Sequence, residues 1–376
     1  PDGPPWQTGK SAREFWAAYF RQVDVSATLA RDEPEMAEIS AAIQRPYTRF
    51  PYPNGNESGA SRAYVMSLMS RYMLMLRLTK LFHLRAWFEL TSGKNAAALA
   101  DTLTMLRLSH SLSEFPFELS ELTQVSILGS GLQMAWVGMQ GQDWTDAQLA
   151  ELQQEIQQFD FLRQALLVEQ GERASYSNSI EWYAEQDFAS REKSLRAPPF
   201  GYDQALPWRL WLDLHAPRFV FTRALLAANA YYDQYDLPAI DLAAQRIYPN
   251  RLNEGQKKFG SSYLFGDRIS VIDGSLIEVV RMQTFLNEAA VACALERYRL
   301  AHGDYPGKLD QLVPQFIEKL PHDLMTGGAM GYERKSDGEL VLSVTAWTHQ
   351  GDDNKSVNTD FIFPTSGKWV WQYATK

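Results

Sequence analysis

The chain is nearly free of cysteine: Cys293 is the single one among 376 residues. One cysteine cannot form a disulfide within the chain, and it cannot supply the several thiolates of a cysteine-based zinc site. Basic side chains are also few, with 36 Lys and Arg against 45 Asp and Glu and a formal net charge of −9. Because nucleic-acid phosphates are bound by concentrated Lys and Arg, we expect no nucleic-acid partner.

Motifs of the common enzyme classes are missing as well. The sequence holds no glycine-rich phosphate loop, no G-x-S-x-G elbow, no H-E-x-x-H pair and no kinase or dinucleotide fingerprint, so these mechanistic classes lose support. The longest uncharged run, 122–142, could span a bilayer by its length, but glutamine, glycine and hydroxyl residues dilute its hydropathy. We expect this run to form a buried helix in a large helical core.

Helical periodicity dominates most of the chain. From residue 60 onward apolar side chains recur on one helical face, Gly93 interrupts them, and the pattern resumes at once, which predicts an antiparallel hairpin. Thr145 and Gln148 form a capping box, which predicts the start of another helix. The further predicted helices cover 118–140, 145–171, 218–235 and, less regularly, 239–258.

The C-terminal part of the chain has a different character. A helix over 275–302 and a short one over 308–319 are followed by the hairpin pattern "GYERK" and "ELVLSVTAW", and "KWVWQY" predicts a third strand. We therefore predict a mainly α fold. In it a multi-helix antiparallel array, residues 1–275, precedes a small α+β module, residues 276–376.

Charged residues interrupt the apolar stripe of one predicted helix, at Glu169, Glu172 and Arg173. Glu169 and Arg173 are spaced i, i+4 and can pair, which leaves Glu172 as a carboxyl group that burial could turn into a general acid. His215, beside Asp213, is the histidine best placed to join it. A structural ion pair that fixes the register of the helix is the other interpretation, because no second catalytic group is identifiable.

Oxygen-bearing side chains gather in the loop "HQGDDNKSVNTDF", 349–361. It contains Asp352, Asp353, Asn354, Asn358 and Asp360 directly after a predicted strand. Calcium accepts several carboxylate and carbonyl oxygens in an adaptable shell, so these residues are candidate calcium ligands. The alternative is a hydrated polar turn, in which Asp and Asn are favoured for local reasons.

Three blocks near the C-terminus follow one another in a recognisable order: "ALERYRLAHGDYPGKLDQL", "KLPHDLMTGGAMGYERKSDGELVLSV" and "GDDNKSVNTDFIF". Together they resemble the C-terminal region of the pseudopilins of type II secretion, over about residues 280–363. The matching positions are Tyr298, Gly303, Tyr305 and Pro306 at the helix end, Pro321 and Asp323 in the middle, and Asp352, Asp353 and Asp360 in the calcium loop. Leu324 stands where the family has a proline.

The resemblance implies a calcium-stabilised tail and export from the cytoplasm. The chain begins without Met, which fits the removal of a signal peptide or a membrane anchor. We therefore expect a periplasmic or envelope-associated protein that would touch a membrane only through such an anchor. The leading expectation is a non-catalytic role in binding or assembly with a protein partner of unknown identity. The alternative is a hydrolase with Glu172, helped by His215 or Asp213, between helices. A third hypothesis is a lipid or small-ligand carrier, suggested by Met and aromatic residues at helical spacing, although core packing explains these residues more simply.

Overall fold

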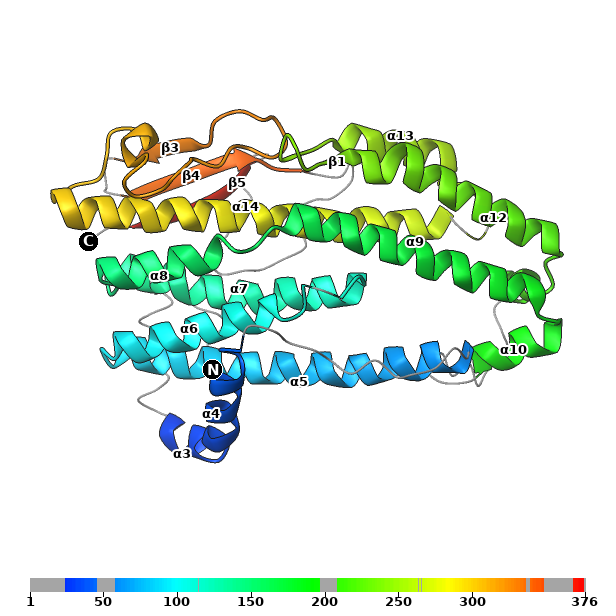
Figure 1. Ribbon diagram of the computed structural model, residues 1–376, viewed down its shortest axis with the longest axis horizontal. Helices are drawn as coiled ribbons and strands as arrows, with labels where there is room; N and C mark the ends of the chain where they lie inside the picture. The colour runs from blue at the N-terminus through cyan, green and yellow to red at the C-terminus, as the bar shows by residue number, and fades with distance from the viewer. Residues whose placement is uncertain are drawn as a thin grey trace.

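The computed structural model describes residues 24–45, 58–113, 115–196, 208–262, 264, 266–335, 339–347 and 368–374. Its α-helices are α3 (Val25–Ala30), α4 (Glu33–Ala42), α5 (Ser58–Thr91), α6 (Asn95–His110), α7 (Glu118–Gly141), α8 (Asp146–Ile156), α9 (Phe161–Glu185), α10 (Phe188–Arg196), α11 (Trp208–Leu214), α12 (Arg218–Tyr231), α13 (Pro249–Phe259) and α14 (Gly266–His302). Most of them lie along the long axis of the molecule, with small antiparallel sheets of two and three strands beside α14 (Figure 1). The predicted mainly α fold with a small sheet is confirmed.

The predicted helical hairpin is formed by α5 and α6. Gly93 adopts φ +73°, a left-handed conformation that favours glycine, and α6 begins two residues later. The two helices pack against each other and both contact α7. The interruption that the sequence placed at Gly93 is therefore the turn of the hairpin.

The uncharged run forms most of α7, which lies at the centre of the helical array and contacts α5, α6, α9 and α14. Its Leu128, Leu132 and Met134 side chains are fully buried. Gly138 allows Trp144 to lie across the helix, since an added Cβ would fall 2.0 Å from the indole ring. Within the described ranges no helix is long and apolar enough to cross a membrane, so the expected buried helix is confirmed.

The predicted helix over 145–171 is in fact two helices. The capping box at its start is present, because the Thr145 side chain accepts from the Gln148 amide and the Gln148 side chain accepts from the Thr145 amide. However, α8 ends at Ile156, and Asp160 caps the start of α9 by accepting from the Arg163 amide at 3.0 Å. A good N-cap therefore outweighed the continuous helical pattern.

The tail sheet has the order β3 (Gly331–Arg334), β4 (Glu339–Thr345), β5 (Lys368–Ala374), with both pairs antiparallel, as predicted. It packs on α14, which ends at His302 and is followed by Gly303 with φ +83°. Tyr305 then folds back over the helix, and its hydroxyl donates to Glu296 Oε1 at 2.6 Å. Tyr373 from β5 donates to the same oxygen at 2.7 Å, which fastens the sheet to the helix.

Two predicted helices are wrong in part. Residues 308–319 contain only the 3₁₀ turn η3 (Leu309–Leu312). The segment 239–258 begins with the short hairpin β1 (Ile240–Asp241) and β2 (Arg246–Ile247) before α13 starts. Gln245 holds the hairpin turn at φ +48°, a conformation that helical periodicity does not reveal.

α14 also runs through residue 275, where the sequence placed a boundary between two domains. One continuous hydrophobic cluster includes Leu132 of α7, Phe285 of α14 and Trp371 of β5. Trp136 adds a polar link between the two parts, since its Nε1 donates to the Gln372 carbonyl at 2.8 Å. The helical array and the tail thus share a core, and their division into 1–275 and 276–376 as separate folding units stays a prediction.

Candidate functional site

The predicted acidic residues of α9 lie against the first turn of α7. Glu172 Oε1 accepts from the backbone amide of Glu118 at 3.0 Å and so satisfies a free amide at the start of that helix. Gly171 makes this approach feasible, because an added Cβ would lie 2.2 Å from the Pro116 carbonyl oxygen. Glu172 of α9 therefore caps the start of α7 in this structure.

Glu169 lies one turn back along α9 and is 3% exposed. Burial, first of all, raises its pKa well above the usual value, and the nearby carboxyl groups of Asp236 and Glu121 raise it further. The same causes, burial and then the charges of Glu118 and Glu172, raise the pKa of Glu121 to about 8. We call Glu118, Glu121, Glu169, Glu172 and Asp236 the carboxylate cluster.

The hydrogen bonding of Glu121 and Glu169 is incomplete. Among the described residues Glu121 Oε1 and Glu169 Oε2 are buried without a hydrogen-bond partner. No Lys or Arg in the described part of the chain lowers the pKa of either group. At neutral pH the pair therefore carries protons, because a buried carboxylate without a counter-charge is strongly disfavoured.

Arg173 does not form the predicted local pair with Glu169 and bonds residues of another helix instead. Its Nε donates to Asn229 Oδ1 at 2.8 Å, and its Nη1 and Nη2 donate to the two carboxylate oxygens of Asp233 at 2.6 and 3.2 Å. These partners belong to α12 and to the π-helical turn η1 (Tyr232–Asp236) that continues it. Arg173 thus fastens α9 to α12 as a structural ion pair.

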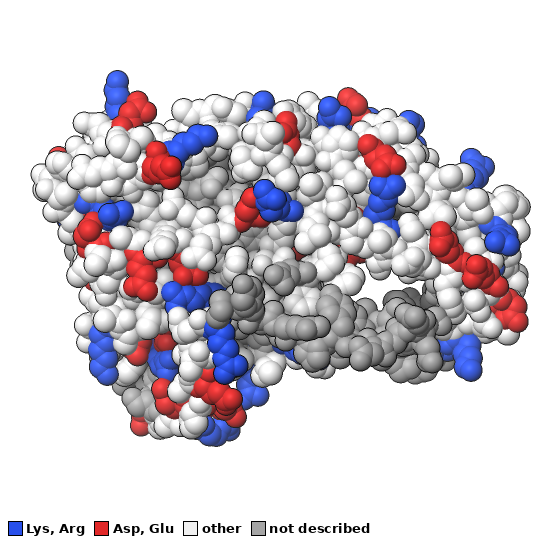
Figure 2. All heavy atoms as spheres, viewed as in Figure 1, with Lys and Arg blue, Asp and Glu red and all other residues white. Residues whose placement is uncertain are grey.

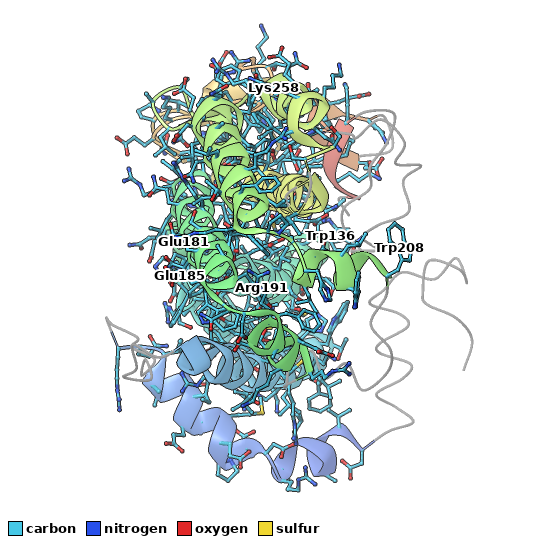
Figure 3. All side chains as sticks on the ribbon, turned by 90° about the vertical axis from the view of Figure 1, so that its right-hand side faces the viewer. Trp136, Glu181, Glu185, Arg191, Trp208 and Lys258 are labelled. Carbon is cyan, nitrogen blue, oxygen red and sulfur yellow. The ribbon has the colours of Figure 1, made fainter. Side chains whose placement is uncertain are left out.

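No described contact joins His215 to Glu169 or Glu172. Its exposed ring lies between Phe188 and Trp211, with centroids 3.9 and 3.8 Å away, and its Nδ1 bonds the Trp211 carbonyl at 2.7 Å. Figure 3 shows Trp208 of the same helix projecting away from the helical array. The described contacts of Glu172 and of His215 thus lie on different elements: Glu172 bonds the start of α7, and His215 packs on Phe188 and Trp211.

The candidate calcium ligands Asp352, Asp353, Asn354, Asn358 and Asp360 all lie outside the described residues. Within the part that is described, no group of three or more His, Cys, Asp or Glu side chains could hold a metal ion.

Cys293 is buried, and burial raises the pKa of its thiol, so it is an inert core residue. On the face drawn in Figure 2, acidic and basic side chains are interspersed.

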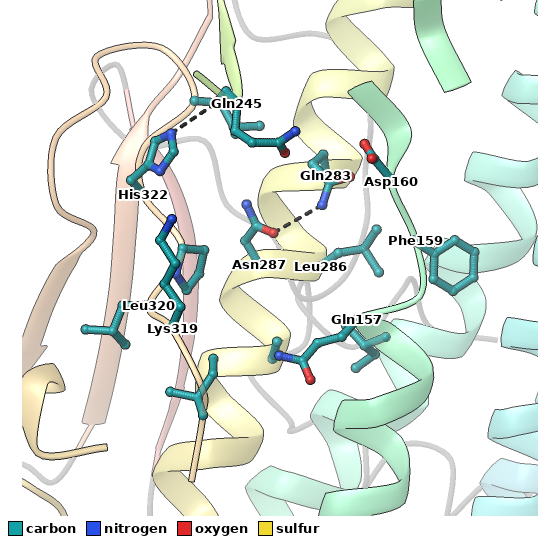
Figure 4. Close-up of a pocket in the computed structure, with 15 residues that line it drawn as sticks. Gln157, Phe159, Asp160, Gln245, Gln283, Leu286, Asn287, Lys319, Leu320 and His322 are labelled. Atoms are coloured by element: carbon teal, nitrogen blue, oxygen red, sulfur yellow. Dashed lines mark hydrogen bonds between the residues drawn. The ribbon is translucent and has the colours of Figure 1, made fainter. Parts of the chain in front are cut away.

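A concave site lies elsewhere, where the α8–α9 connection, α14 and the segment 317–324 meet (Figure 4). The cavity has a volume of about 400 Å³, within the range of small-molecule sites. Its apolar part includes Ile156, Leu286, Ala290 and Ile317. We call it the seam pocket, because the helical array forms one side of it and the tail the other.

The polar lining of the seam pocket is rich in side-chain amides. Gln283 and Asn287, one turn apart on α14, are joined by a 3.1 Å hydrogen bond from Gln283 Nε2 to Asn287 Oδ1. Gln283 Oε1 accepts from the Phe161 amide at 2.7 Å, which fixes its orientation. Gln157 adds a third amide from the end of α8, and Gln245 a fourth from the β1–β2 turn.

The tail side of the pocket is held by hydrogen bonds to the β1–β2 turn. His322 Nε2 lies 3.1 and 3.0 Å from the carbonyls of Ala244 and Gln245, so that nitrogen carries the hydrogen, and Nδ1 is left with a lone pair in the neutral ring. The Ile247 amide donates to the Leu324 carbonyl at 3.0 Å. The wall that carries Gln245 and His322 is therefore rigid.

Sequence reasoning missed this pocket because its polar residues come from four separate segments. The i, i+4 spacing of Gln283 and Asn287 is a local signal, but polar pairs on helices are too frequent to mark a site. The predicted helix over 145–171 also placed Gln157 inside a helix, whereas the observed break brings it to the rim of the pocket.

Comparison of the chain with protein-family models, with curated proteins and with solved structures gives no match. The functional argument therefore rests on the geometry of the site. In the carboxylate cluster Glu121 and Glu169 are buried acids with raised pKa values, whereas the seam pocket is concave and presents accessible donors and acceptors of hydrogen bonds.

Proposed function

We propose that this protein is a non-catalytic binding protein that takes a small polar ligand in the seam pocket. One observation carries the proposal: a cavity of about 400 Å³ lined by amide side chains at the junction between the helical array and the tail. Concave sites with an apolar wall and a few oriented polar groups are the usual form of small-molecule sites. Because both parts of the chain line the cavity, a bound ligand would also stabilise their junction.

The lining supports binding rather than catalysis. An acid–base mechanism needs titratable groups within hydrogen-bonding reach of one another. The titratable residues of the lining are Asp160, Lys319 and His322. Asp160 caps α9 and lies 3.4 Å from Arg163 Nε, and His322 Nε2 is engaged with backbone carbonyls, so neither is poised to exchange a proton with the other.

The hydrolase alternative receives no support from the contacts of its residues. It requires Glu172 to share a cleft with His215 or Asp213, yet Glu172 caps α7 and the His215 ring lies between Phe188 and Trp211. A buried acid such as Glu169 could serve as a proton donor only if a substrate could reach it. We therefore do not carry this alternative forward.

The setting of the protein is also a proposal, and it rests on the sequence resemblance. A pseudopilin-like tail with calcium bound by residues 352–360 fits a periplasmic or envelope-associated protein with a protein partner. Calorimetric titration of calcium into the chelator-stripped protein, repeated on Asp353→Ala, tests the calcium part. Binding that the substitution removes supports it, and the absence of heat at millimolar calcium refutes it.

Thermal-shift screening tests the binding function itself. We expect at least one class of small polar molecule, among sugars, dipeptides, carboxylic acids and amines, to raise the melting temperature. A ligand at 100 times its Kd stabilises the folded state by about 2.7 kcal/mol. The shift should be lost in Asn287→Leu and kept in Gln154→Ala, which changes an exposed residue of α8 outside the pocket. A screen without any shift in the wild type would refute the proposal.

A further inference from the structure

The charge of the seam pocket limits what can bind there. The free amides at the start of α9 are the natural place for an anion, because a helix N-terminus attracts negative charge. Here two of those amides are already used: Asp160 accepts from the Arg163 amide, and Gln283 accepts from the Phe161 amide at 2.7 Å. The Asp160 carboxylate would also repel an anionic ligand from this end of the pocket.

A cationic ligand is no better matched. Asp160 is the one carboxylate of the described lining, and it faces Arg163 Nε at 3.4 Å. Lys319, exposed on the opposite wall, adds a positive charge. The formal charges of Asp160 and Lys319 therefore cancel. Neither an anionic nor a cationic ligand would meet a buried, unpaired group of opposite charge in this lining.

The hydrogen-bonding groups of the lining that remain available are neutral and include both donors and acceptors. Asn287 keeps its Nδ2 hydrogens as donors, because only its Oδ1 is used internally. Gln245 keeps Oε1 as an acceptor while its Nε2 donates to the Leu242 carbonyl at 3.0 Å, and His322 Nδ1 is a second acceptor. Gln157 makes no described side-chain hydrogen bond and offers both a donor and an acceptor. A ligand that satisfies this set must donate and accept at several points without carrying charge.

Hydroxyl groups meet that requirement, since each donates one hydrogen bond and accepts two. The apolar part of the pocket, from Leu286, Ala290 and Ile317, matches the C–H face of a sugar ring. Building on the proposed binding function, we propose that the ligand is an uncharged, polyhydroxylated molecule of the carbohydrate class. Asn287 and Gln157 donate to ring hydroxyls, Gln245 and His322 accept from them, and the apolar wall packs against the C–H face.

Isothermal titration of the full chain with matched sugars tests this inference. The probes are neutral hexoses, N-acetylhexosamines and their disaccharides, followed by the uronic acid and the amino sugar that correspond to the best neutral binder. We expect the neutral sugar to bind and each charged analogue to bind at least tenfold more weakly. Asn287→Leu should weaken the neutral sugar at least tenfold, and Gln154→Ala should leave its affinity unchanged.

The outcomes separate this inference from the function on which it rests. If no sugar binds, or if a charged analogue binds better than its neutral parent, the carbohydrate inference is overturned. If a dipeptide, acid or amine then binds in a way that Asn287→Leu removes, the seam pocket is still a binding site with another ligand. If no class of probe binds to the wild type, both fail. Circular dichroism and melting of each variant show whether the substitution left the fold intact.

Discussion

The carboxylate cluster and the seam pocket both place polar side chains between helices, yet they differ in access and in charge. In the cluster Glu121 and Glu169 are 1% and 3% exposed, and each has an oxygen without a hydrogen-bond partner among the described residues. In the pocket the amides are oriented by internal hydrogen bonds and still keep groups free toward a cavity. We conclude that the raised pKa values of Glu121 and Glu169 reflect the cost of burying acids in the fold. The neutral amides of the seam pocket are the better candidates for function.

The close approach of α9 to the start of α7 is the feature of the cluster that should be most sensitive to mutation. Gly171→Ala would place a methyl group 2.2 Å from the Pro116 carbonyl oxygen, and backbone must move to relieve it. We expect a loss of about 1–3 kcal/mol of unfolding free energy, in the range of overpacked cores. Chemical denaturation measures it.

Gly274→Ala is the matched control, because that glycine is also helical and an added Cβ meets nothing within 4 Å. It should be neutral or stabilise the protein by up to about 1 kcal/mol, since alanine favours a helix over glycine. Equal losses in the two variants would show that the contact between Gly171 and Pro116 is not as close as described.

The protonated pair predicts how stability depends on pH. The pKa of Glu121 is about 8 in the folded protein against 4.5 for the free group, so the native state binds more protons than the unfolded state between these values. The free energy of unfolding contributed by this group is therefore full below about pH 4.5 and falls as pH rises toward 8. Glu169, whose pKa is also raised, acts in the same direction.

Replacing both acids by the neutral amide should remove this dependence. We expect the double variant Glu121→Gln with Glu169→Gln to gain roughly 2–3 kcal/mol relative to the wild type at pH 9 compared with pH 6, the change that linkage gives for Glu121 alone. Denaturation curves across that range measure it, with Glu181→Gln, an exposed residue of α9, as the control. A wild-type profile as flat as that of the double variant would contradict the assignment of protons to these groups.

Substitutions of Glu172 test whether this residue caps α7, and their expected effect on stability is smaller. Glu172→Ala removes the acceptor of the Glu118 amide and should cost about 1 kcal/mol, as the loss of other helix caps does. Glu172→Gln keeps an oxygen in place and should recover most of that stability. If both variants keep full stability, Glu172 does not cap α7.

The smallest expected effect on stability belongs to the pocket. Gln157 is exposed and makes no described side-chain hydrogen bond, so Gln157→Ala should change the unfolding free energy by less than about 0.5 kcal/mol. Ligand affinity should nevertheless fall severalfold, as measured by calorimetry beside Gln154→Ala. A change in stability without a change in affinity would mean that Gln157 serves the fold and not the site.

Much of the fold could be predicted because local chemistry and tertiary packing agree. The hairpin at Gly93 and the capping box at Thr145 each follow from residues a few positions apart. The break before Asp160 was missed because apolar spacing continues across it. Sequence periodicity cannot show which of two compatible local structures the remaining packing will select.

The site was less predictable because it depends on contacts between distant segments. Glu169 is buried on α9 and Glu172 is half-buried beside it, but their neighbours Glu121 and Asp236 belong to other elements and are acids. The spacing of residues along the sequence gives no reason to expect carboxyl groups, which carry the same charge, to lie together. The seam pocket joins residues more than 150 positions apart, from Gln157 to His322, and only the folded chain brings them to one cavity.

The most direct test of the binding function is an NMR titration that observes the pocket amides themselves. Side-chain NH₂ signals of Asn287 and Gln157, assigned by single substitution in protein labelled at Asn and Gln, should shift in a saturable way as the neutral sugar is added. Signals of Gln154, outside the pocket, should stay fixed. Saturable shifts elsewhere with none at Asn287 and Gln157, or no shifts with any small polar ligand, would contradict the assignment of the seam pocket as the binding site.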